Sequence, residues 1–520
     1  MSGRTETSLV RESATVFGRT ADAVVGLTTI LFLLALAALV RLVPLSASVA
    51  GLTIPKLFGL GLSVAGLAVL GFGLASRVGA VDTDPSRSAG LITGLGFGVV
   101  GLVVGGVVGA VVSGGLLWVG ASVVGGVGAF AVTVLPREDI GSTASPAFVS
   151  LFVGAVLVSG LLEPGWQWHP AGPQFSGGFT AAATIPLAVA FCSLLGGWAA
   201  AKSRGRFGAS GRELGAYFVV YLTAFSILAV MVSIVAFVTV KGAPYALRGV
   251  RLVGHFPFVQ WPFVMRPFIP LTDKLTGILP AVVGTAWLVI GATVFAVPLG
   301  VGAAIFLTEY AEQGRFTQIV ETATSALWST PSVVFGLFGA AFLIPRLGGD
   351  RSLLAGMLVL GFMLLPLVLI TSREAIKSVP DEYRDASAAL GVTKWKTIRS
   401  VVLPAAMPGV ITGIILGVGR IAGETAPLIL VLGSTLNSTE AVHVLSGFKF
   451  VARPPFVINT ALLQESAALP TQIWAIIAAG VSGSPERGWA TAFVLLAVVL
   501  VFYAIGIASR TYFRRKLDYE

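Results

Sequence analysis

The stretch LLAGMLVLGFMLLPLVLITS, residues 353–372, contains 20 residues and no charged side chain. An α-helix of this length crosses the hydrocarbon core of a bilayer, which is roughly 30 Å thick. A strand is excluded as the spanning element, because lipid offers no hydrogen-bond partner to the backbone groups of an open strand edge. We therefore predict a transmembrane helix here, and the same reasoning applies to other apolar stretches along the chain.

Similar apolar stretches recur from end to end and predict an all-α, polytopic membrane protein with about 12 transmembrane helices. Six come first, at 22–43, 56–76, 90–112, 116–135, 147–163 and 180–201. A basic link, KSRGRFGASGRE (202–213), precedes the other six, at 214–240, 280–307, 322–344, 353–372, 408–433 and 489–509. Only 11% of the residues are charged, against about 25% in soluble proteins. We expect an N-terminal accessory membrane region at 1–205 and a second membrane domain at 206–520.

The net charge of +10 lies largely in short loops between the spans, which favours membrane orientation over nucleic-acid binding. With the N-terminus inside the cell, the cytoplasmic loops of the second half hold 15 Lys and Arg, and the opposite loops hold 10. This bias predicts a multi-pass protein of the cell membrane, in contact with lipid, with both termini in the cytoplasm. The first 20 residues have no apolar core, so we expect no cleavable signal peptide.

The first six spans are rich in glycine and poor in charge. Fourteen glycines lie between Gly90 and Gly128, several of them four residues apart, which predicts a tightly packed helix hairpin. We see no ionisable residue deep inside these spans, so we predict no transport path there. The single cysteine, Cys192, excludes an internal disulfide and is interpreted as a small apolar side chain.

The hydrophilic loop REAIKSVPDEYRDASAALGVTKWKTIRSVVLP, residues 373–404, follows the span quoted first, and we call it the elbow. Pro380 suits the first turn of a short helix, and the two acidic residues after it complement the helix dipole. Gly391 then provides a stop, and Thr393 can begin the next helix. The sequence predicts two short helices joined at a glycine turn; a plain solvated linker is the alternative.

The elbow resembles the EAA loop of ABC-importer permeases. That pattern is E-A-A, three residues, G, nine residues, I, one residue and L-P, and the elbow keeps its spacing with three conservative replacements. The matching positions are Asp385, Ala386, Ser387, Gly391, Val401, Leu403 and Pro404. In that family the loop docks into a groove of a separate ATPase subunit. The resemblance therefore implies that these residues couple ATP hydrolysis to movement of the spans.

Further segments make the second half similar to PstA-type permeases of phosphate ABC importers. They follow in matching order and are TEYAEQGRF (308–316), STPSVVFGLFG (329–339), EAIKSVP (374–380), LPAAMPGVITGIILGVGRIAGETAPL (403–428) and ALPTQIW (468–474). The resemblance implies a MetI-like, six-helix ABC importer permease fold at 206–520, and it adds Glu374 to the coupling loop. It also implies import of inorganic phosphate together with a PstB-like ATPase dimer, a PstC-like second permease and an extracytoplasmic PstS-like phosphate-binding protein. The first 200 residues fall outside it.

Two charged residues, Arg420 and Glu424, interrupt the apolar span at 408–433. A helix starting near Pro408 places Arg420 12 residues in, or roughly 18 Å deep, where a charge needs a partner or a water-filled path. Four residues apart, the two side chains share a helix face and can pair. A guanidinium suits phosphate oxygens, so we predict a substrate path through Arg420, Glu424 and Thr425. An ion pair that locks two helices or forms a gate is the alternative.

The chain lacks the motifs of an ATPase or of other common catalysts. No lysine follows a glycine, so no Walker A loop exists, and no GxSxG, HExxH or CxxC motif occurs. The three histidines are far apart and show no metal-ligand spacing. We therefore expect a transport subunit and not an enzyme, with no cofactor and with ATP hydrolysis on a separate subunit.

The predicted outer loops, 241–277 and 434–488, are rich in proline and aromatic residues, including HFPFVQWPFVMRPFIP (255–270). Aromatic anchoring at the membrane surface is one interpretation. The resemblance implies instead that a substrate-binding protein docks there.

Three other functions stay open. A proton- or sodium-driven secondary transporter would show related halves and several buried carboxylates, whereas the halves here do not repeat. An assembly or sensor subunit that transports nothing would work through the first six spans. Within the ABC class, a permease for sulfate or molybdate would differ from a phosphate permease in its substrate.

Overall fold

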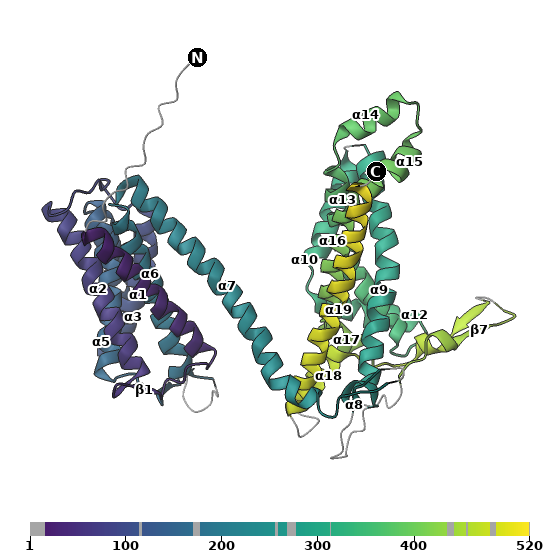
Figure 1. Ribbon diagram of the computed structural model, residues 1–520, viewed down its shortest axis with the longest axis horizontal. Coiled ribbons are helices and arrows are strands. Elements are labelled where there is room, and N and C mark those ends of the chain that lie inside the picture. Colours follow the sequence, from purple (N-terminus) through teal and green to yellow (C-terminus); the bar gives the residue numbers. More distant parts are fainter. Residues whose placement is uncertain are drawn as a thin grey trace. The chain divides into compact units, whose positions relative to one another are not determined.

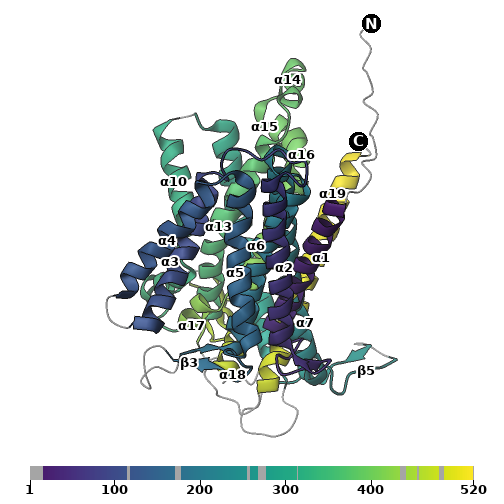
Figure 2. The same cartoon turned by 90° about the vertical axis from the view of Figure 1, so that its left-hand side faces the viewer.

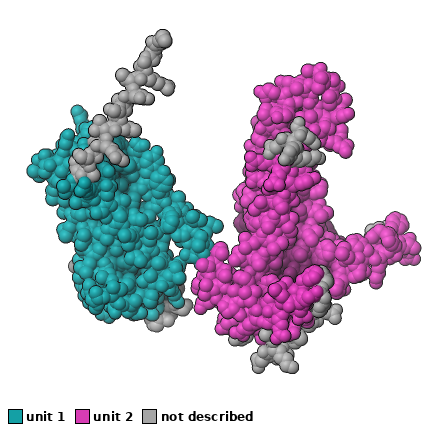
Figure 3. All heavy atoms as spheres, in the orientation of Figure 1, with its two compact units in different colours: residues 1–234 teal, residues 235–520 magenta. Residues whose placement is uncertain are grey.

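The architecture was obtained as a computed structural model of the chain. It describes residues 16–113, 117–169, 177–254, 258–267, 277–312, 314–433, 441–453, 456–478 and 485–518. Contacts divide the chain into two compact units, residues 1–234 and 235–520 (Figure 3). The division falls inside one long helix, α7 (Gly208–Ala246), whereas the sequence placed the domain boundary at 205/206. The basic link is no spacer between the units, because it forms the end of α6, a turn and the start of α7.

Within its described residues, unit 1 contains six complete helices and two short antiparallel hairpins. The helices are α1 (Val16–Leu39), α2 (Ile54–Val78), α3 (Leu91–Ser113), α4 (Leu117–Val134), α5 (Glu138–Ser159) and α6 (Ala181–Arg204). The hairpins pair β1 (Ser48–Val49) with β2 (Leu52–Thr53) and β3 (Gln167–Trp168) with β4 (Phe179–Thr180). The helices pack chiefly as pairs, α1 with α6, α2 with α5 and α3 with α4 (Figure 2).

Apolar side chains of α1, α2, α5 and α6 form the core of unit 1, with Leu62 and Ile185 fully buried. The α3–α4 pair approaches closely through its glycines. A Cβ atom on Gly101 or Gly105 would lie 2.3 Å from a backbone carbonyl oxygen of α4, so a larger residue cannot be accommodated there. The predicted close packing of a glycine-rich hairpin is confirmed.

Unit 2 contains the rest of α7, twelve further helices, several helical turns and two hairpins within its described residues. The helices are α8 (Pro262–Met265), α9 (Leu279–Ile305), α10 (Arg315–Ser329), α11 (Ser332–Phe338), α12 (Ile344–Arg346), α13 (Leu353–Lys377), α14 (Asp381–Ala389), α15 (Lys394–Thr397), α16 (Leu403–Ala422), α17 (Ala426–Val431), α18 (Leu469–Ile477) and α19 (Pro485–Asp518). The π-helical segments are η1 (Phe306–Tyr310), η2 (Gly339–Leu343) and η3 (Ile398–Val402), and the 3-10 turns are η4 (Leu445–Gly447) and η5 (Thr460–Leu463). The hairpins pair β5 (Arg251–Leu252) with β6 (Val259–Gln260) and β7 (Phe448–Phe450) with β8 (Val457–Asn459).

Helices α9, α13 and α16 form the centre of unit 2. Their apolar faces share one core that includes Leu288, Leu360 and Ile421, and α19 packs against α16. Helices α14 and α15 lie at one end of this unit, at the end where α19 finishes (Figures 1 and 2). Helices α8 and α18 lie at the opposite end.

The prediction of about 12 spans is confirmed. Among the described residues, 11 helices are long and apolar enough to cross a membrane, or 12 if one bent pair counts as a single span. That pair replaces the straight span predicted at 322–344: α10 and the helix at 332–346 are bent by 102°. The cause is Pro331, which has no N–H to continue α10 and holds Thr330 in an extended conformation.

Candidate functional site

The elbow folds as two short helices joined by a left-handed glycine. Pro380 is the N-cap of α14, one position before the first turn in which we placed it. At the other end, Gly391 has φ +71° and its N–H donates to the carbonyl of Ala388. Thr393 is the N-cap of α15, as predicted. The predicted helix–glycine–helix arrangement is therefore confirmed.

The residues predicted for coupling lie on four helical segments and in the turn between two of the elbow helices. They are Glu374 in the last turn of α13, Asp385, Ala386 and Ser387 in α14, Val401 in η3, and Leu403 and Pro404 at the start of α16, with Gly391 in the turn. Asp385 and Ala386 are exposed, whereas Ser387 is buried and its hydroxyl donates to the backbone carbonyl of Tyr383. Their part in ATPase coupling stays a prediction.

Three large side chains on the elbow point away from the rest of the chain. Tyr383, Leu390 and Trp395 are 52%, 82% and 56% exposed. Exposed apolar surface rimmed by charged residues is typical of a protein-binding surface. These residues were not predicted from the sequence, because single apolar residues in a polar loop carry no periodic signal.

A small apolar cluster supports the elbow from beneath. It joins Ala304 at the end of α9, Ile376 at the end of α13 and Val379 just after it, Val402 at the end of η3, and Ala406 at the start of α16. All five are buried, so the elbow is packed onto the helices on both sides of it.

The predicted substrate path lies where α16 is broken. α16 ends at Ala422, and α17 begins at Ala426 after the N-cap residue Thr425. α16 also begins at Leu403, five residues before the Pro408 start from which we estimated the depth of the charge. Through α15 and η3 the helical run extends back to Lys394. Arg420 therefore lies further from the elbow end than predicted.

Arg420 is held from two sides at this break. Its Nε atom lies 3.7 Å from Oε1 of Glu424, so the predicted pair is confirmed. Its Cζ atom lies 4.6 Å from the ring centroid of Trp328, in the last turn of α10, a cation–π contact that the sequence did not predict. The side chain is 40% exposed and donates no hydrogen bond to any described residue. Thr425 lies beside the pair, and its hydroxyl makes only a 3.5 Å contact with the carbonyl of Gly423.

The second broken helix meets the first one at the same place. α11, which follows the bend after α10, packs against α17. The approach is close, since a Cβ atom on Gly336 would lie 2.7 Å from Cα of Pro427. Both helix breaks and the Arg420–Glu424 pair thus belong to one site.

Comparisons with known proteins decide the family. The family described as "Binding-protein-dependent transport system inner membrane component" matches residues 296–519. The chain is 41% identical over 214 residues to the phosphate transport system permease protein PstA 1 of Mycobacterium tuberculosis (strain ATCC 25618 / H37Rv). The aligned region covers 41% of this chain and 68% of that protein. The chain belongs to the ABC importer permeases.

Other relatives agree with this assignment. The probable ABC transporter permease protein YqgH of Bacillus subtilis (strain 168) is 34% identical over 237 residues, which is 44% of this permease and 74% of that protein. PstA of Xylella fastidiosa (strain 9a5c) is 33% identical over 236 residues, 45% of this permease and 74% of that protein. Among solved structures, a chain of the inward-facing MetNI methionine ABC transporter is similar at 16% identity and a TM-score of 0.35, over 46% of this permease and 94% of that chain, and the family assignment does not rest on it.

The family sets the general role of the permease. It is a multi-pass membrane protein and a transport subunit of an importer, and such permeases work with an ATPase and a substrate-binding protein. The family match begins at residue 296 and therefore leaves out unit 1.

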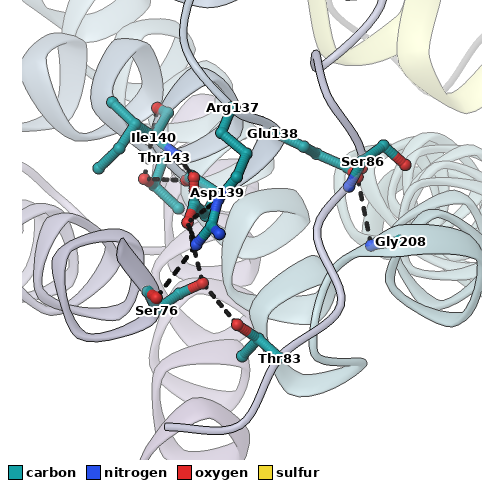
Figure 4. A network of polar contacts seen from close by, with 9 residues as sticks. All are labelled: Ser76, Thr83, Ser86, Arg137, Glu138, Asp139, Ile140, Thr143 and Gly208. Atoms are coloured by element: carbon teal, nitrogen blue, oxygen red, sulfur yellow. Dashed lines mark hydrogen bonds and ion pairs between the residues drawn. The ribbon is translucent and has the colours of Figure 1, made fainter. Parts of the chain in front are cut away.

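Unit 1 of the permease buries charged side chains at the ends of its helices, just outside the spans predicted from hydropathy. Glu138 is fully buried and Lys202 is 2% exposed, and Nζ of Lys202 lies 2.8 Å from Oε1 of Glu138. The backbone N–H groups of Ser86 and Gly208 donate to Oε2 of Glu138 at 2.8 and 3.2 Å (Figure 4). Hydropathy placed the start of this span at residue 147, but α5 begins at Glu138 because partners from three other segments satisfy its charge.

The neighbouring carboxylate is satisfied in the same way. Asp139 accepts hydrogen bonds from Nε of Arg137 and from the hydroxyl of Ser76, each at 3.0 Å (Figure 4). The bond to Asp139 raises the pKa of Arg137, which lies just before the span. Glu138, Asp139 and their partners join the ends of α2, α5, α6 and α7, which suits a structural joint.

Proposed function

We propose that this permease imports inorganic phosphate, and that Arg420 lies on the translocation path. The substrate is supported by the relatives, of which the phosphate permease of M. tuberculosis is 41% identical over 214 residues. The path is supported by one observation above all. Arg420 presents a guanidinium with unused donors at a helix break, inside an otherwise apolar span.

The chemistry of Arg420 fits an oxyanion. Its planar fork of N–H donors matches two phosphate oxygens, and it stays charged at any working pH. Glu424 and Trp328 orient the guanidinium from two sides, and neither accepts a hydrogen bond from its N–H donors. A hydroxyl donor from Thr425 adds to the site. A pair that only locks or gates two helices would instead need Arg420 and Glu424 to bind each other strongly, and 3.7 Å exceeds hydrogen-bond distance.

The elbow is the part of the permease that we propose contacts the ATPase. We infer that a PstB-like ATPase dimer covers Tyr383, Leu390 and Trp395, and that Asp385 and Gly391 transmit its movement. The remaining partners are a PstC-like second permease and a PstS-like binding protein on the outer side. This assembly places the elbow and both termini in the cytoplasm, in agreement with the excess of basic residues in the loops on that side.

A competition assay tests the substrate. Cells, or right-side-out vesicles loaded with ATP, that contain the permease with its partners are given radiolabelled phosphate and an excess of unlabelled phosphate, sulfate or molybdate. We expect only phosphate to compete. Competition by sulfate or molybdate at equal concentration would transfer the assignment to that oxyanion. ATP-independent uptake by the purified chain alone, driven by an ion gradient, would support the secondary-transporter alternative instead.

Substitution of Arg420 tests the path. A hydrogen bond to a charged group contributes about 1.5–3 kcal/mol, so Arg420→Ala should lower uptake roughly 10- to 100-fold in complexes that assemble normally. Arg420→Lys keeps the charge but not the fork, and it should retain an intermediate rate. Arg77→Ala, at an exposed arginine of unit 1, is the matched control and should leave uptake unchanged. Full uptake by assembled Arg420→Ala would end the proposal for this residue.

Substitution in the elbow tests coupling. Asp385→Lys and Gly391→Trp should each lower the amount of phosphate transported per ATP hydrolysed, because both change the surface or shape that meets the ATPase. Asp350→Lys changes an exposed aspartate outside the elbow in the same way and serves as the control. Unchanged coupling in both elbow variants would contradict the assignment of the elbow.

A further inference from the structure

One side chain of the elbow turns inward and joins three helices. Arg384 of α14 donates from Nη2 to Oε1 of Glu309 at 2.8 Å and from Nε to the same oxygen at 3.3 Å. It also donates to the carbonyls of Ile376 and Val379, at 3.2 and 2.8 Å, at the end of α13. Its next neighbour along α14, Asp385, is exposed. Arg384 therefore faces the membrane helices, and Asp385 faces outward.

Glu309 belongs to the segment that continues α9. Helix α9 and the π-helical segment η1 form one run from Leu279 to Tyr310, long and apolar enough to cross the membrane. The side chain of Glu309 is 7% exposed and that of Arg384 is 22% exposed, so solvent weakens this ion pair less than it weakens a surface pair. The hydrogen bond to Glu309 raises the pKa of Arg384, so the guanidinium stays charged.

The residue after Glu309 contacts the other arm of the elbow. Nζ of Lys394, the first residue of α15, lies 5.1 Å from the ring centroid of Tyr310. Two adjacent residues of η1 thus hold α14 and α15, which lie on either side of the Gly391 turn. The buried cluster of Ala304, Ile376 and Val402 fills the space beneath.

We propose that Glu309 and Arg384 form a clasp that makes the elbow move together with the end of α9. Without the clasp, the elbow keeps its chain connections to α13 and α16, the contact of Lys394 with Tyr310 and the buried cluster beneath it, but α14 loses its ion pair with the end of α9. With it, a displacement imposed on α14 also reaches α9, which packs along α13. Glu309 is then a positioning residue for transport, although the spacing pattern of the elbow does not include it. This inference rests on the proposed coupling role of the elbow.

The test compares two glutamates three residues apart in the assembled complex. Glu309→Gln keeps the size of the side chain and removes its charge, and Glu312→Gln does the same at an exposed position of the same segment. Uptake of radiolabelled phosphate and ATP hydrolysis are measured on equal amounts of complex. We expect transport per ATP to fall about tenfold in Glu309→Gln, as for a typical coupling between sites, and to stay unchanged in Glu312→Gln.

A double substitution and a conservative one exclude a merely structural effect. If Glu309 and Arg384 act as one unit, Glu309→Gln combined with Arg384→Gln should lower transport per ATP no further than the worse single variant. If Glu309→Gln does not assemble, the test uses Glu309→Asp instead, because this variant keeps the charge but shortens the side chain so that it no longer reaches Arg384. Unchanged transport per ATP in the assembled Glu309→Gln, or in Glu309→Asp where that variant must be used, would overturn the clasp.

The same experiment separates this proposal from the one on which it rests. If Asp385→Lys and Gly391→Trp lower transport per ATP and Glu309→Gln does not, the clasp alone is wrong. If none of the three has an effect, the coupling role of the elbow is wrong as well.

Discussion

Replacement of Lys202 by Met tests how strongly the buried ion pair stabilises unit 1. The ammonium group lies 2.8 Å from Oε1 of Glu138 and 2.8 Å from the hydroxyl of Ser142, and it is 2% exposed. Removal of one partner from a buried pair typically costs about 3–5 kcal/mol, because the other charge stays buried. Glu138 keeps hydrogen bonds from two backbone N–H groups and has Arg212 at 3.5 Å. We therefore expect Lys202→Met to lower the free energy of unfolding by about 3 kcal/mol, the lower end of that range.

A neighbouring pair provides a matched control for this prediction. Arg204 lies two residues further along α6, and its Nε atom is also 2.8 Å from a carboxylate, that of Asp22, but the two side chains are 43% and 58% exposed. Arg204→Met should therefore cost about 0–1 kcal/mol. The assay is thermal unfolding of the purified full chain in one detergent, followed by fluorescence and by the fraction that stays monodisperse. Equal, small shifts for both variants would refute the reasoning, because burial would then make no difference.

Two other substitutions test backbone features. Gly105→Leu should disrupt the α3–α4 pair and lower the thermal stability of the full chain, because its Cβ would lie 2.3 Å from a backbone carbonyl oxygen, whereas Gly120→Leu, with open space around it, should leave the unfolding temperature unchanged. Gly391→Val should cost about 1–2 kcal/mol of strain at the left-handed turn and raise proteolytic cleavage in the elbow, and Gly391→Asn, which tolerates that conformation better, should show a smaller increase. Equal cleavage in the two Gly391 variants would show that backbone strain is not the cause.

Features set by local sequence were predictable. The spans follow from runs of apolar residues, and the elbow follows from Gly391 between two helix starts, because each signal lies within a few residues. The proximity of Arg420 and Glu424 was predicted from their spacing of four residues, although Glu424 lies just beyond the end of α16 and not on it.

Features set by contacts between distant residues were not predictable. Arg384 and Glu309 are 75 residues apart, and Lys202 and Ser142 are 60 apart, so no periodic pattern connects them. The charges of Glu138 and Lys202 looked like loop residues at the ends of spans, because hydropathy does not register a partner in another helix. The bend at Pro331 was missed for a related reason, since the apolar content on both sides reads as one continuous span.

The break after α16 gives the elbow a physical means of acting on Arg420. The helical run from Lys394 to Arg420 contains 27 residues and rises by 26 steps, or ~39 Å, so a tilt of about 5° at the elbow would move the other end by about 3 Å. Glu424 lies beyond the end of this run, next to α17, which is held by α11. A continuous helix would carry both charges together and leave their separation unchanged. Because the helix is broken at Gly423, we expect the same tilt to change the 3.7 Å separation of the pair, which on the proposed path would expose the guanidinium to substrate or withdraw it as the elbow moves.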